Sequence, residues 1–219
     1  EDFWADRRYR RDPVKELIAQ GADLILNLSA SPWHVGKEQT RLAMLQRVAR
    51  DERVPLVEAN AVGANDELIF DGHSVALDRQ GEVLALGKGF TEEVLVVEVD
   101  GQTPTTKPSW PAKEEPLFRA LSLGIRDYVG KCGFQSVVLG LSGGIDSALT
   151  AVLAVDALGA DKVMGVSMPA RYSSCGSLTD AEGLAKNLGI RYEVIPIEPA
   201  FKAVEGQLAN VFAGTKPNE

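Results

Sequence analysis

The turn Ser142-Gly143-Gly144-Ile145-Asp146-Ser147 carries residue types that could bind phosphate and support chemistry on it. It joins an apolar run at residues 137–141 to a stretch of good helix formers at residues 146–158, which ends at Gly159. Backbone N–H groups at the start of a helix lack intrahelical partners and lie at the positive end of the helix dipole. The turn therefore predicts a phosphate site, where the glycines let the backbone approach the anion closely.

The residues after the glycines decide which kind of phosphate loop this is. The common loop of nucleoside triphosphatases needs a lysine after its last glycine, whereas Ile145 and Asp146 stand there in this chain. A carboxylate would repel phosphate unless a cation lay between them, so Asp146 implies Mg²⁺. Packing alone gives no reason for Ser, Asp and Ser at these positions.

The loop resembles the S-G-G-x-D-S loop of the ATP pyrophosphatases. The resemblance implies that it holds the β,γ-pyrophosphate of ATP while a carboxylate or carbonyl of the second substrate attacks the α-phosphorus and becomes an adenylate. The resemblance also leaves several substrates open within that superfamily.

The composition limits the partners that this site could serve. The net charge of −8 and the pI near 4.9 argue against a broad nucleic-acid surface, which weakens the tRNA-modifying branch of the superfamily. The two cysteines are too few for a disulfide framework and fit a reducing compartment such as the cytoplasm. No apolar run approaches the roughly 20 residues of a membrane span, so we expect no membrane partner.

The first half of the chain predicts a sheet layered with helices. A helix begins at Asp12-Pro13 and ends at Gly21. The remaining pattern predicts strands at residues 23–28, 54–60 and 94–99, a helix at 38–50, a polar loop at 62–72, and a hairpin with arms at 75–77 and 83–86.

The second half predicts alternating strands and helices after a proline-rich boundary at residues 101–116. We expect strands at 137–141, 162–168 and 192–197 and helices at 117–131, 146–158, 179–189 and 201–212, the third of which opens with a capping box from Thr179 to Glu182. Such alternation favours an α/β fold with a parallel, doubly wound sheet.

Taken together, the two halves closely resemble glutamine-dependent NAD⁺ synthetase. The first half contributes Glu1-Asp2-Phe3-Trp4, residues 27–37 and residues 60–72, which look like the C-terminal part of a nitrilase-type glutamine amidase. The second contributes the phosphate loop, residues 168–174 and Asp180-Ala181. The resemblance implies that residues 1–100 are part of a nitrilase-like α-β-β-α sandwich. It also implies that residues 101–116 are a linker and that residues 117–219 begin an ATP-pyrophosphatase domain of the adenine nucleotide alpha hydrolase type.

The resemblance also implies an activity. The amidase would release ammonia from L-glutamine through a Glu-Lys-Cys triad, and the synthetase would adenylate deamido-NAD⁺ with ATP before ammonia displaces AMP. The triad residues would all precede Glu1, so the chain itself contributes no catalytic amidase residue. We therefore expect an inactive internal fragment of a longer homo-oligomeric enzyme.

Site residues follow from the same resemblance, residue by residue. Ser31 and Lys37 match positions that bind glutamine, and Asp146 matches the magnesium ligand. The positions expected to contact ATP are Gly140, Leu141, Ser142, Gly143, Gly144, Ile145, Asp146, Ser147, Ser167, Met168 and Arg171.

Two other functions compete with this interpretation. Another ATP pyrophosphatase joined to a different amidotransferase, such as a relative of GMP synthetase or asparagine synthetase, would lack the nitrilase-like segments of the first half. A nucleotide-binding module without turnover could dispense with Asp146.

The other reactive residues have simpler explanations. Cys132 and Cys175 have no histidine placed to activate them, so we expect incidental or packing thiols. His34 and His73 lack the spacing of a zinc site.

Overall fold

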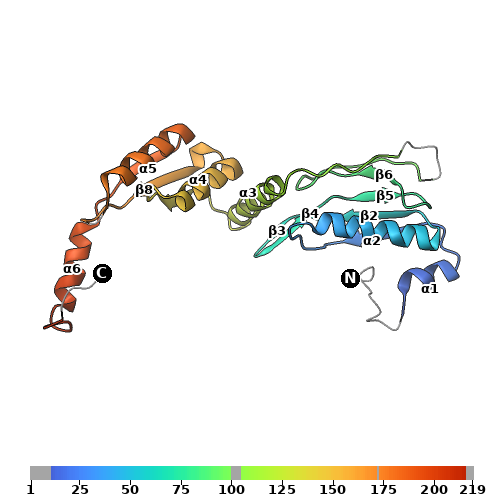
Figure 1. Cartoon of the computed structure of the whole chain (residues 1–219), viewed down its shortest axis with the longest axis horizontal. Helices are drawn as coiled ribbons and strands as arrows, with labels where there is room; N and C mark the ends of the chain where they lie inside the picture. Colours follow the sequence, from blue (N-terminus) through green and yellow to red (C-terminus); the bar gives the residue numbers. More distant parts are fainter. Residues whose placement is uncertain (1–10, 100–104, 172, 216–219) are drawn as a thin grey trace. The chain divides into compact units, whose positions relative to one another are not determined.

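The computed structural model describes residues 11–99, 105–171 and 173–215, and it divides the chain into two compact units, Glu1–Tyr128 and Val129–Glu219 (Figure 1). The segment Glu1-Asp2-Phe3-Trp4 and residues 101–104 of the expected linker lie outside the described residues.

The first unit contains a sheet with the strand order β1-β2-β5-β6. Its strands are β1 (Ile25–Ser29), β2 (Leu56–Asn60), β5 (Val75–Leu77) and β6 (Val83–Leu86). β1 pairs with β2 in parallel, whereas β2 with β5 and β5 with β6 pair antiparallel. The expected strands at 23–28 and 54–60 and the expected hairpin are confirmed.

Two helices of the first unit also match their predictions. In α1 (Pro13–Ala19), the side chain of Asp12 accepts a hydrogen bond from the N–H of Lys15, and Pro13 stands at the first helical position. α2 (Lys37–Glu52) buries an apolar stripe that includes Leu42, Leu45 and Ala49. This stripe packs with strand residues in one core, whose buried members are Val14, Ile25, Leu42, Leu45, Ala49, Val54, Leu56, Val75, Leu77 and Val83.

Residues 62–72 were expected to form a polar loop, and that prediction was wrong. They form an antiparallel hairpin of β3 (Val62–Asn65) and β4 (Leu68–Asp71). Asp66 turns the chain with a φ of 50°, a left-handed conformation that Asp adopts more readily than most residues. The polar residues of the turn made the whole segment look like a loop, although the short stretches on either side pair as strands.

The expected strand at residues 94–99 was also wrong. These residues belong to none of the three sheets, and Val94 and Val96 are 91% and 94% exposed. Apolar alternation indicates a strand only where a neighbouring strand supplies hydrogen-bond partners.

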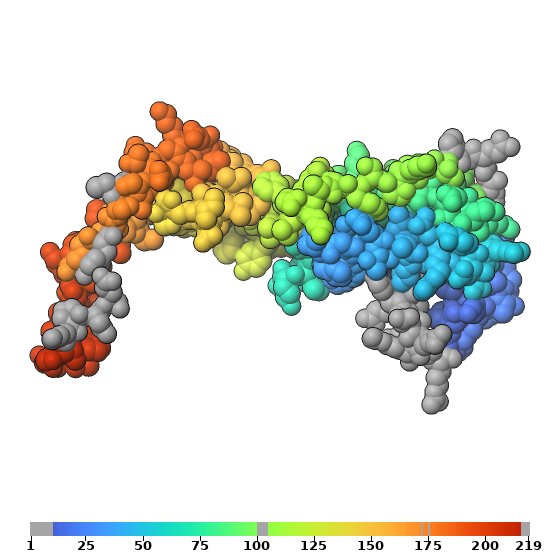
Figure 2. All heavy atoms as spheres, viewed as in Figure 1, coloured from blue at the N-terminus to red at the C-terminus, as the bar shows by residue number. Residues whose placement is uncertain are grey.

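α3 (Glu114–Lys131) packs largely in the first unit. Its residues Ala120 and Leu123 share a buried cluster with Phe90, and the carboxylate of Asp127 accepts a 2.7 Å hydrogen bond from the N–H of Ala64. Figure 2 shows the segment before α3 and the start of the helix (light green) along the surface beside α2 (blue). The domain boundary at residues 101–116 stays a prediction.

The second unit contains a three-stranded parallel sheet with the order β7-β8-β9. Its elements are β7 (Val137–Gly140), α4 (Ile145–Leu158), the short helix η2 (Ala160–Lys162), β8 (Val163–Ser167), α5 (Cys175–Leu188), β9 (Arg191–Val194) and α6 (Glu198–Leu208). The parallel sheet is confirmed. Among the described residues, α4 and α5 share one core cluster through Ala151, Ala154, Ala181 and Ala185.

Two helix ends in this unit differ from the sequence prediction. α5 begins at Cys175, because Ser174 accepts a hydrogen bond from the N–H of Ser177 and caps the helix. The expected capping box at Thr179 therefore lies inside the helix. α6 begins at Glu198 and ends at Leu208, a few residues before the range expected.

None of the helices in the described part of the chain is long and apolar enough to cross a membrane.

Candidate functional site

The phosphate loop lies between β7 and α4, as its sequence predicts. The N–H of Leu141 still pairs with Val166 O at 2.8 Å, and the chain then leaves the sheet. Gly144 precedes the first residue of α4 with a φ of −88° and a ψ of 159°, and no side chain caps the helix. The first N–H groups of α4 therefore remain available to an anion.

Gly143 is required by its surroundings. Its φ of 79° lies in the left-handed region, and a Cβ atom there would approach Ser177 O to 2.4 Å and Ser177 Cα to 2.7 Å. The loop thus passes directly against the backbone at the start of α5. Only glycine allows this close approach without moving one of the two segments.

The hydroxyl groups of the loop bond to each other and to the loop backbone. Ser147 Oγ donates to Gly144 O at 2.9 Å and lies 3.1 Å from Ser142 Oγ. The N–H groups of Ser142 and Gly144 each reach a serine oxygen at 3.3 Å. These long, exposed contacts shape the loop, and phosphate oxygens could replace them at small cost.

A pocket of about 430 Å³ adjoins this loop. Five of the expected ATP residues line it: Gly140 at the end of β7, Leu141, Ser142, and Ser167 and Met168 at the end of β8. Residues 143–147 of the turn are not among its lining residues. The carboxyl ends of two neighbouring parallel strands therefore meet in one pocket, as sites in such sheets do. Ser167 itself is buried, donating to Leu141 O at 2.6 Å and accepting from Tyr192 Oη at 2.7 Å.

The same pocket contains residues that the sequence analysis missed. Ser173, Ser174, Ser177 and Leu178 line it from the start of α5. The helix was predicted to begin at Thr179, so these residues were placed before it and not in its first turn. The Ser-Ser pair before a helix-forming stretch is itself a capping signal.

Asp146 and Ile145 lie in the first turn of α4, and both are exposed. In the part of the chain that the structure describes, no group of three His, Cys, Asp or Glu residues could hold a metal. A single exposed carboxylate beside a phosphate site fits Mg²⁺, which is usually held by one or two carboxylates together with phosphate oxygens and water.

Arg171 does not line the pocket. Its guanidinium group contacts Glu198 at 2.7 Å and Glu205 at 3.1 Å, and it lies 4.9 Å above the ring of Phe201. These contacts tie the segment after β8 to α6.

In the first unit, Ser31 and Lys37 lie at the two ends of the segment between β1 and α2. Ser31 is 9% exposed, and its N–H donates to Asn60 Oδ1 at 3.0 Å. Lys37 Nζ donates to Pro32 O. Burial lowers the pKa of Lys37, and the nearby positive charge of Arg41 lowers it further.

A buried polar network lies directly beneath this segment. Arg41 donates to the two carboxylate oxygens of Asp71 at 3.0 and 2.9 Å and to Gly72 O at 2.9 Å. Asp71 also lies 2.7 Å from His73 Nδ1, and Arg41 Nε lies 3.5 Å from Glu58 Oε2. Arg41, Glu58 and Asp71 are 2%, 3% and 0% exposed.

The pKa values of the two carboxyl groups in this network are shifted in opposite directions. Burial raises the pKa of Glu58, and Arg41 offsets only part of this effect. Burial would also raise the pKa of Asp71, but the hydrogen bonds from His73 and Arg41 outweigh it, so this pKa lies below its usual range. Asp71 is therefore the ionised partner of Arg41.

This network was not predicted from the sequence. Arg41 looks like one more charged residue on a helix, and Asp71 lies in the segment that was taken for a loop. The signal available was Glu58, a charged residue between the apolar residues Val57 and Ala59 of β2.

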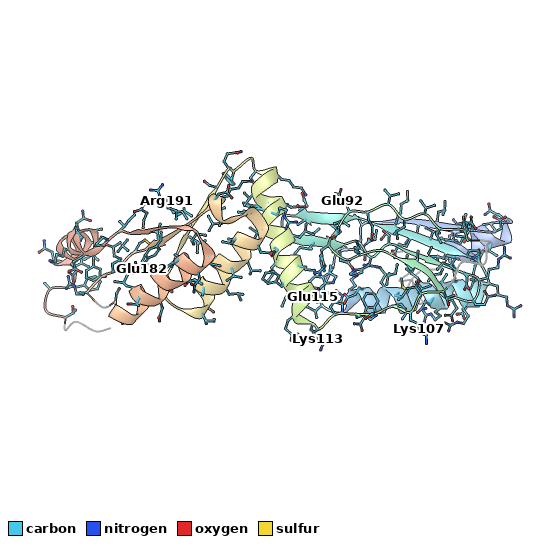
Figure 3. All side chains as sticks on the ribbon, turned by 90° about the horizontal axis from the view of Figure 1, so that it is seen from above. Glu92, Lys107, Lys113, Glu115, Glu182 and Arg191 are labelled. Atoms are coloured by element: carbon cyan, nitrogen blue, oxygen red, sulfur yellow. The ribbon has the colours of Figure 1, made fainter. Side chains whose placement is uncertain are left out.

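Several charged residues outside these two regions are exposed. Figure 3 shows Glu115 on α3 in the first unit and, in the second unit, Glu182 and Arg191. None of the three belongs to the two regions described above.

Family models match both halves of the chain. The family described as carbon-nitrogen hydrolase matches residues 5–107, and the family described as NAD synthase matches residues 117–216.

Curated proteins named glutamine-dependent NAD(+) synthetase are similar to the chain. The one from Synechocystis sp. is 42% identical and matches 97% of this chain and 39% of its own length. The one from Thermotoga maritima is 41% identical and matches 100% of this chain and 44% of its own length. The chain thus spans about two fifths of the length of these relatives.

Solved structures agree with the sequence comparisons. The structure of glutamine-dependent NAD⁺ synthetase from Acinetobacter baumannii in complex with ADP has a TM-score of 0.86 and 33% identity, over 99% of this chain and 41% of that chain. The enzyme of the same name from Cytophaga hutchinsonii, at 21% identity and a TM-score of 0.74 over 89% of this chain and 39% of that chain, supports the fold. A nitrilase-like segment followed by an ATP-pyrophosphatase segment is thus confirmed as the fold class.

Proposed function

Because the chain belongs to the glutamine-dependent NAD⁺ synthetase family, we propose that the protein adenylates deamido-NAD⁺ with ATP and amidates it with ammonia from glutamine. The observation that supports this proposal most directly is that Ser142 of the phosphate loop lines the same pocket as Ser167 and Met168. The nitrilase-like first unit distinguishes this enzyme from other ATP-pyrophosphatase amidotransferases.

The loop would act first by binding and orienting ATP. The N–H groups at the start of α4 and the hydroxyls of Ser142 and Ser147 would hold the β,γ-pyrophosphate, exchanging their present mutual contacts for phosphate oxygens. Holding the pyrophosphate in place aligns it as the leaving group, so attack at the α-phosphorus costs less entropy. The pocket beside Met168 would take the adenosine.

Asp146 would hold Mg²⁺ together with phosphate oxygens. The ion would supply positive charge that offsets the negative charge developing on the pyrophosphate. The exposed carboxylate at the first turn of α4 supports this role, since it lies beside the expected phosphate position. Arg171 would contact the nucleotide only if it left Glu198, so it is the least supported of the proposed ATP residues.

In the first unit, Ser31 and Lys37 would bind the substrate glutamine. The ammonium group of Lys37 would pair with the carboxylate of glutamine. Ser31 is buried, so its polar atoms would face the substrate from the inner side of the segment 31–37. We further propose that the protein works in the cytoplasm as a homo-oligomer, on the grounds of its family and its low cysteine content.

The test supplies the full-length protein with deamido-NAD⁺, ATP and Mg²⁺, using glutamine or ammonium as the only nitrogen source. NAD⁺, AMP and pyrophosphate should form with either source. If ammonium alone works, the synthetase assignment stands and the glutamine assignment of the first unit fails. If neither yields NAD⁺, the loop serves another acceptor.

A further inference from the structure

The polar network beneath the segment 31–37 contacts Ser31, one of the two residues proposed to bind glutamine, and includes Arg41, which lies one helical turn from the other, Lys37. Its first connection runs through Asn60, which is 7% exposed at the end of β2. Asn60 Oδ1 accepts the N–H of Ser31 at 3.0 Å, while its Nδ2 donates to Gly72 O at 2.8 Å and to Asp71 Oδ1 at 3.3 Å. The amide oxygen of Asn60 faces a donor and its amide nitrogen faces acceptors, so only one orientation of the side-chain amide satisfies both.

The second connection runs through Arg41. It lies four residues after Lys37 on α2, so the two side chains leave the helix on the same face. The guanidinium group donates to both Asp71 oxygens and to Gly72 O; Asn60 also donates to Asp71 Oδ1 and Gly72 O. The same buried acceptors thus bind Asn60, which holds the Ser31 end of the segment, and Arg41, which lies one helical turn after Lys37.

The middle of the segment is anchored separately. The N–H of Trp33 donates to Ile69 O at 2.6 Å, and Pro32 bridges to Phe70 on β4. Loss of Asn60 would therefore loosen the Ser31 end without releasing the whole segment. This separation allows a positioning role to be distinguished from a general structural one.

We propose that Asn60 is a positioning residue for the glutamine substrate, holding Ser31 in register with Lys37 through the buried acceptors Asp71 and Gly72 O. The inference rests on the proposed function, since it assigns the geometry of the glutamine subsite. Buried ion pairs are often replaceable by apolar residues without loss of stability. A role in stability alone therefore does not explain this network, in which Asn60 accepts the N–H of Ser31, an expected substrate-binding residue.

The test is Asn60→Ala in the full-length protein, assayed for glutamine hydrolysis and for NAD⁺ formation with each nitrogen source. Loss of a buried hydrogen-bond partner costs enough to raise KM for glutamine about tenfold. We expect kcat to fall much less, and NAD⁺ formation from ammonium to stay at the wild-type rate.

Ser74→Ala is the matched control. Ser74 Oγ accepts the backbone N–H of Asn60 at 3.0 Å, so this variant loosens the end of β2 but leaves the contact between Asn60 and Ser31. KM for glutamine should stay near the wild-type value. Equal increases in KM for both variants would indicate general loosening and overturn the proposal.

Two further outcomes would also overturn it: an unchanged KM in Asn60→Ala, or an equal loss of ammonium-dependent and glutamine-dependent synthesis. If Asn60→Ala does not fold, Asn60→Asp keeps the side-chain volume and the acceptor for Ser31 but places a carboxylate oxygen against Asp71. It should raise KM, and an unchanged value would count against the proposal. A wild-type protein that cannot use glutamine would instead refute the proposed function.

Discussion

The region proposed to bind glutamine and the region proposed to bind ATP use polar residues in different ways. In the first unit, Arg41, Glu58 and Asp71 are nearly inaccessible to solvent; Arg41 donates charge-assisted hydrogen bonds to Asp71 and forms an ion pair with Glu58 at 3.5 Å. In the second unit, Ser142, Gly144 and Asp146 are exposed, and the loop is held by hydroxyl contacts of about 3 Å and by the close approach of Gly143 to α5.

The two regions differ in whether the protein or the ligand supplies the negative charge. In the first unit the protein supplies both signs of charge and buries them, so the segment 31–37 has its shape before a ligand arrives. In the second unit the ligand would bring the phosphate charge, and the protein supplies N–H groups, hydroxyls and a carboxylate. Substitutions should accordingly damage stability in the first unit and ligand binding in the second.

The largest expected effect on stability is that of Asp71→Ala. It removes both hydrogen bonds from Arg41 to a carboxylate and leaves the buried guanidinium group with Gly72 O and with Glu58 at 3.5 Å. Breaking a buried pair in this way costs about 3–5 kcal/mol. Hydrogen exchange of β2 and β5 in the full-length protein should accelerate strongly, whereas the exposed Glu67→Ala should leave it unchanged. Similar exchange in both variants would mean that the network is not the stabilising element of this unit.

Gly143→Ala should have the next largest effect, and it is best compared with Gly133→Ala. Both glycines have positive φ, at 79° and 75°, so each alanine carries roughly 1–2 kcal/mol of strain. Only at Gly143 would the new Cβ meet backbone atoms, at Ser177. We expect Gly143→Ala to lose ATP-dependent synthesis and Gly133→Ala to retain it; equal activity in the two variants would argue against the close approach.

Glu58→Gln should change how stability depends on pH. The pKa of Glu58 is raised in the folded protein, so the contribution of its carboxyl group is fully present below its unfolded pKa and is lost as pH rises through the folded pKa. A glutamine cannot ionise. The free energy of unfolding of Glu58→Gln, relative to the wild type, should therefore increase between pH 4 and pH 8, as measured by chemical denaturation; a difference that decreases with pH would contradict the raised pKa.

Arg171→Ala should have the smallest effect. Its ion pairs with Glu198 and Glu205 are solvent-accessible, and such pairs contribute little to stability. Hydrogen exchange should accelerate in α6 alone, while Arg191→Ala, which removes a pair with Glu193 on the same strand, should not affect α6. Faster exchange throughout the second unit would mean that Arg171 contributes more than these contacts indicate.

The sequence predicted the parts of the fold that depend on local pattern. The strand, glycine turn and helix around residues 137–158 and the hairpin arms at 75–77 and 83–86 follow from apolar runs and turn residues, and the structure contains them. The strand expected at residues 94–99 failed because pairing depends on a neighbouring strand, which a local pattern does not report.

The buried network could not be predicted because its members are far apart in the chain. Arg41 and Asp71 are 30 residues apart, and Ser31 and Asn60 are 29 apart. Each is an ordinary polar residue until β1, β2 and α2 bring them together. The serines at the start of α5 were missed for a local reason, since a second capping pattern five residues later competed with Ser174.

The most direct test of the two separate roles is NAD⁺ formation from ammonium by full-length Asp146→Ala, compared with Asn60→Ala. Removing a group that stabilises developing charge typically lowers the rate about 100-fold or more. We predict that loss for Asp146→Ala with either nitrogen source, and a defect in Asn60→Ala with glutamine alone. Wild-type synthesis from ammonium by Asp146→Ala would contradict the proposed role of the phosphate loop.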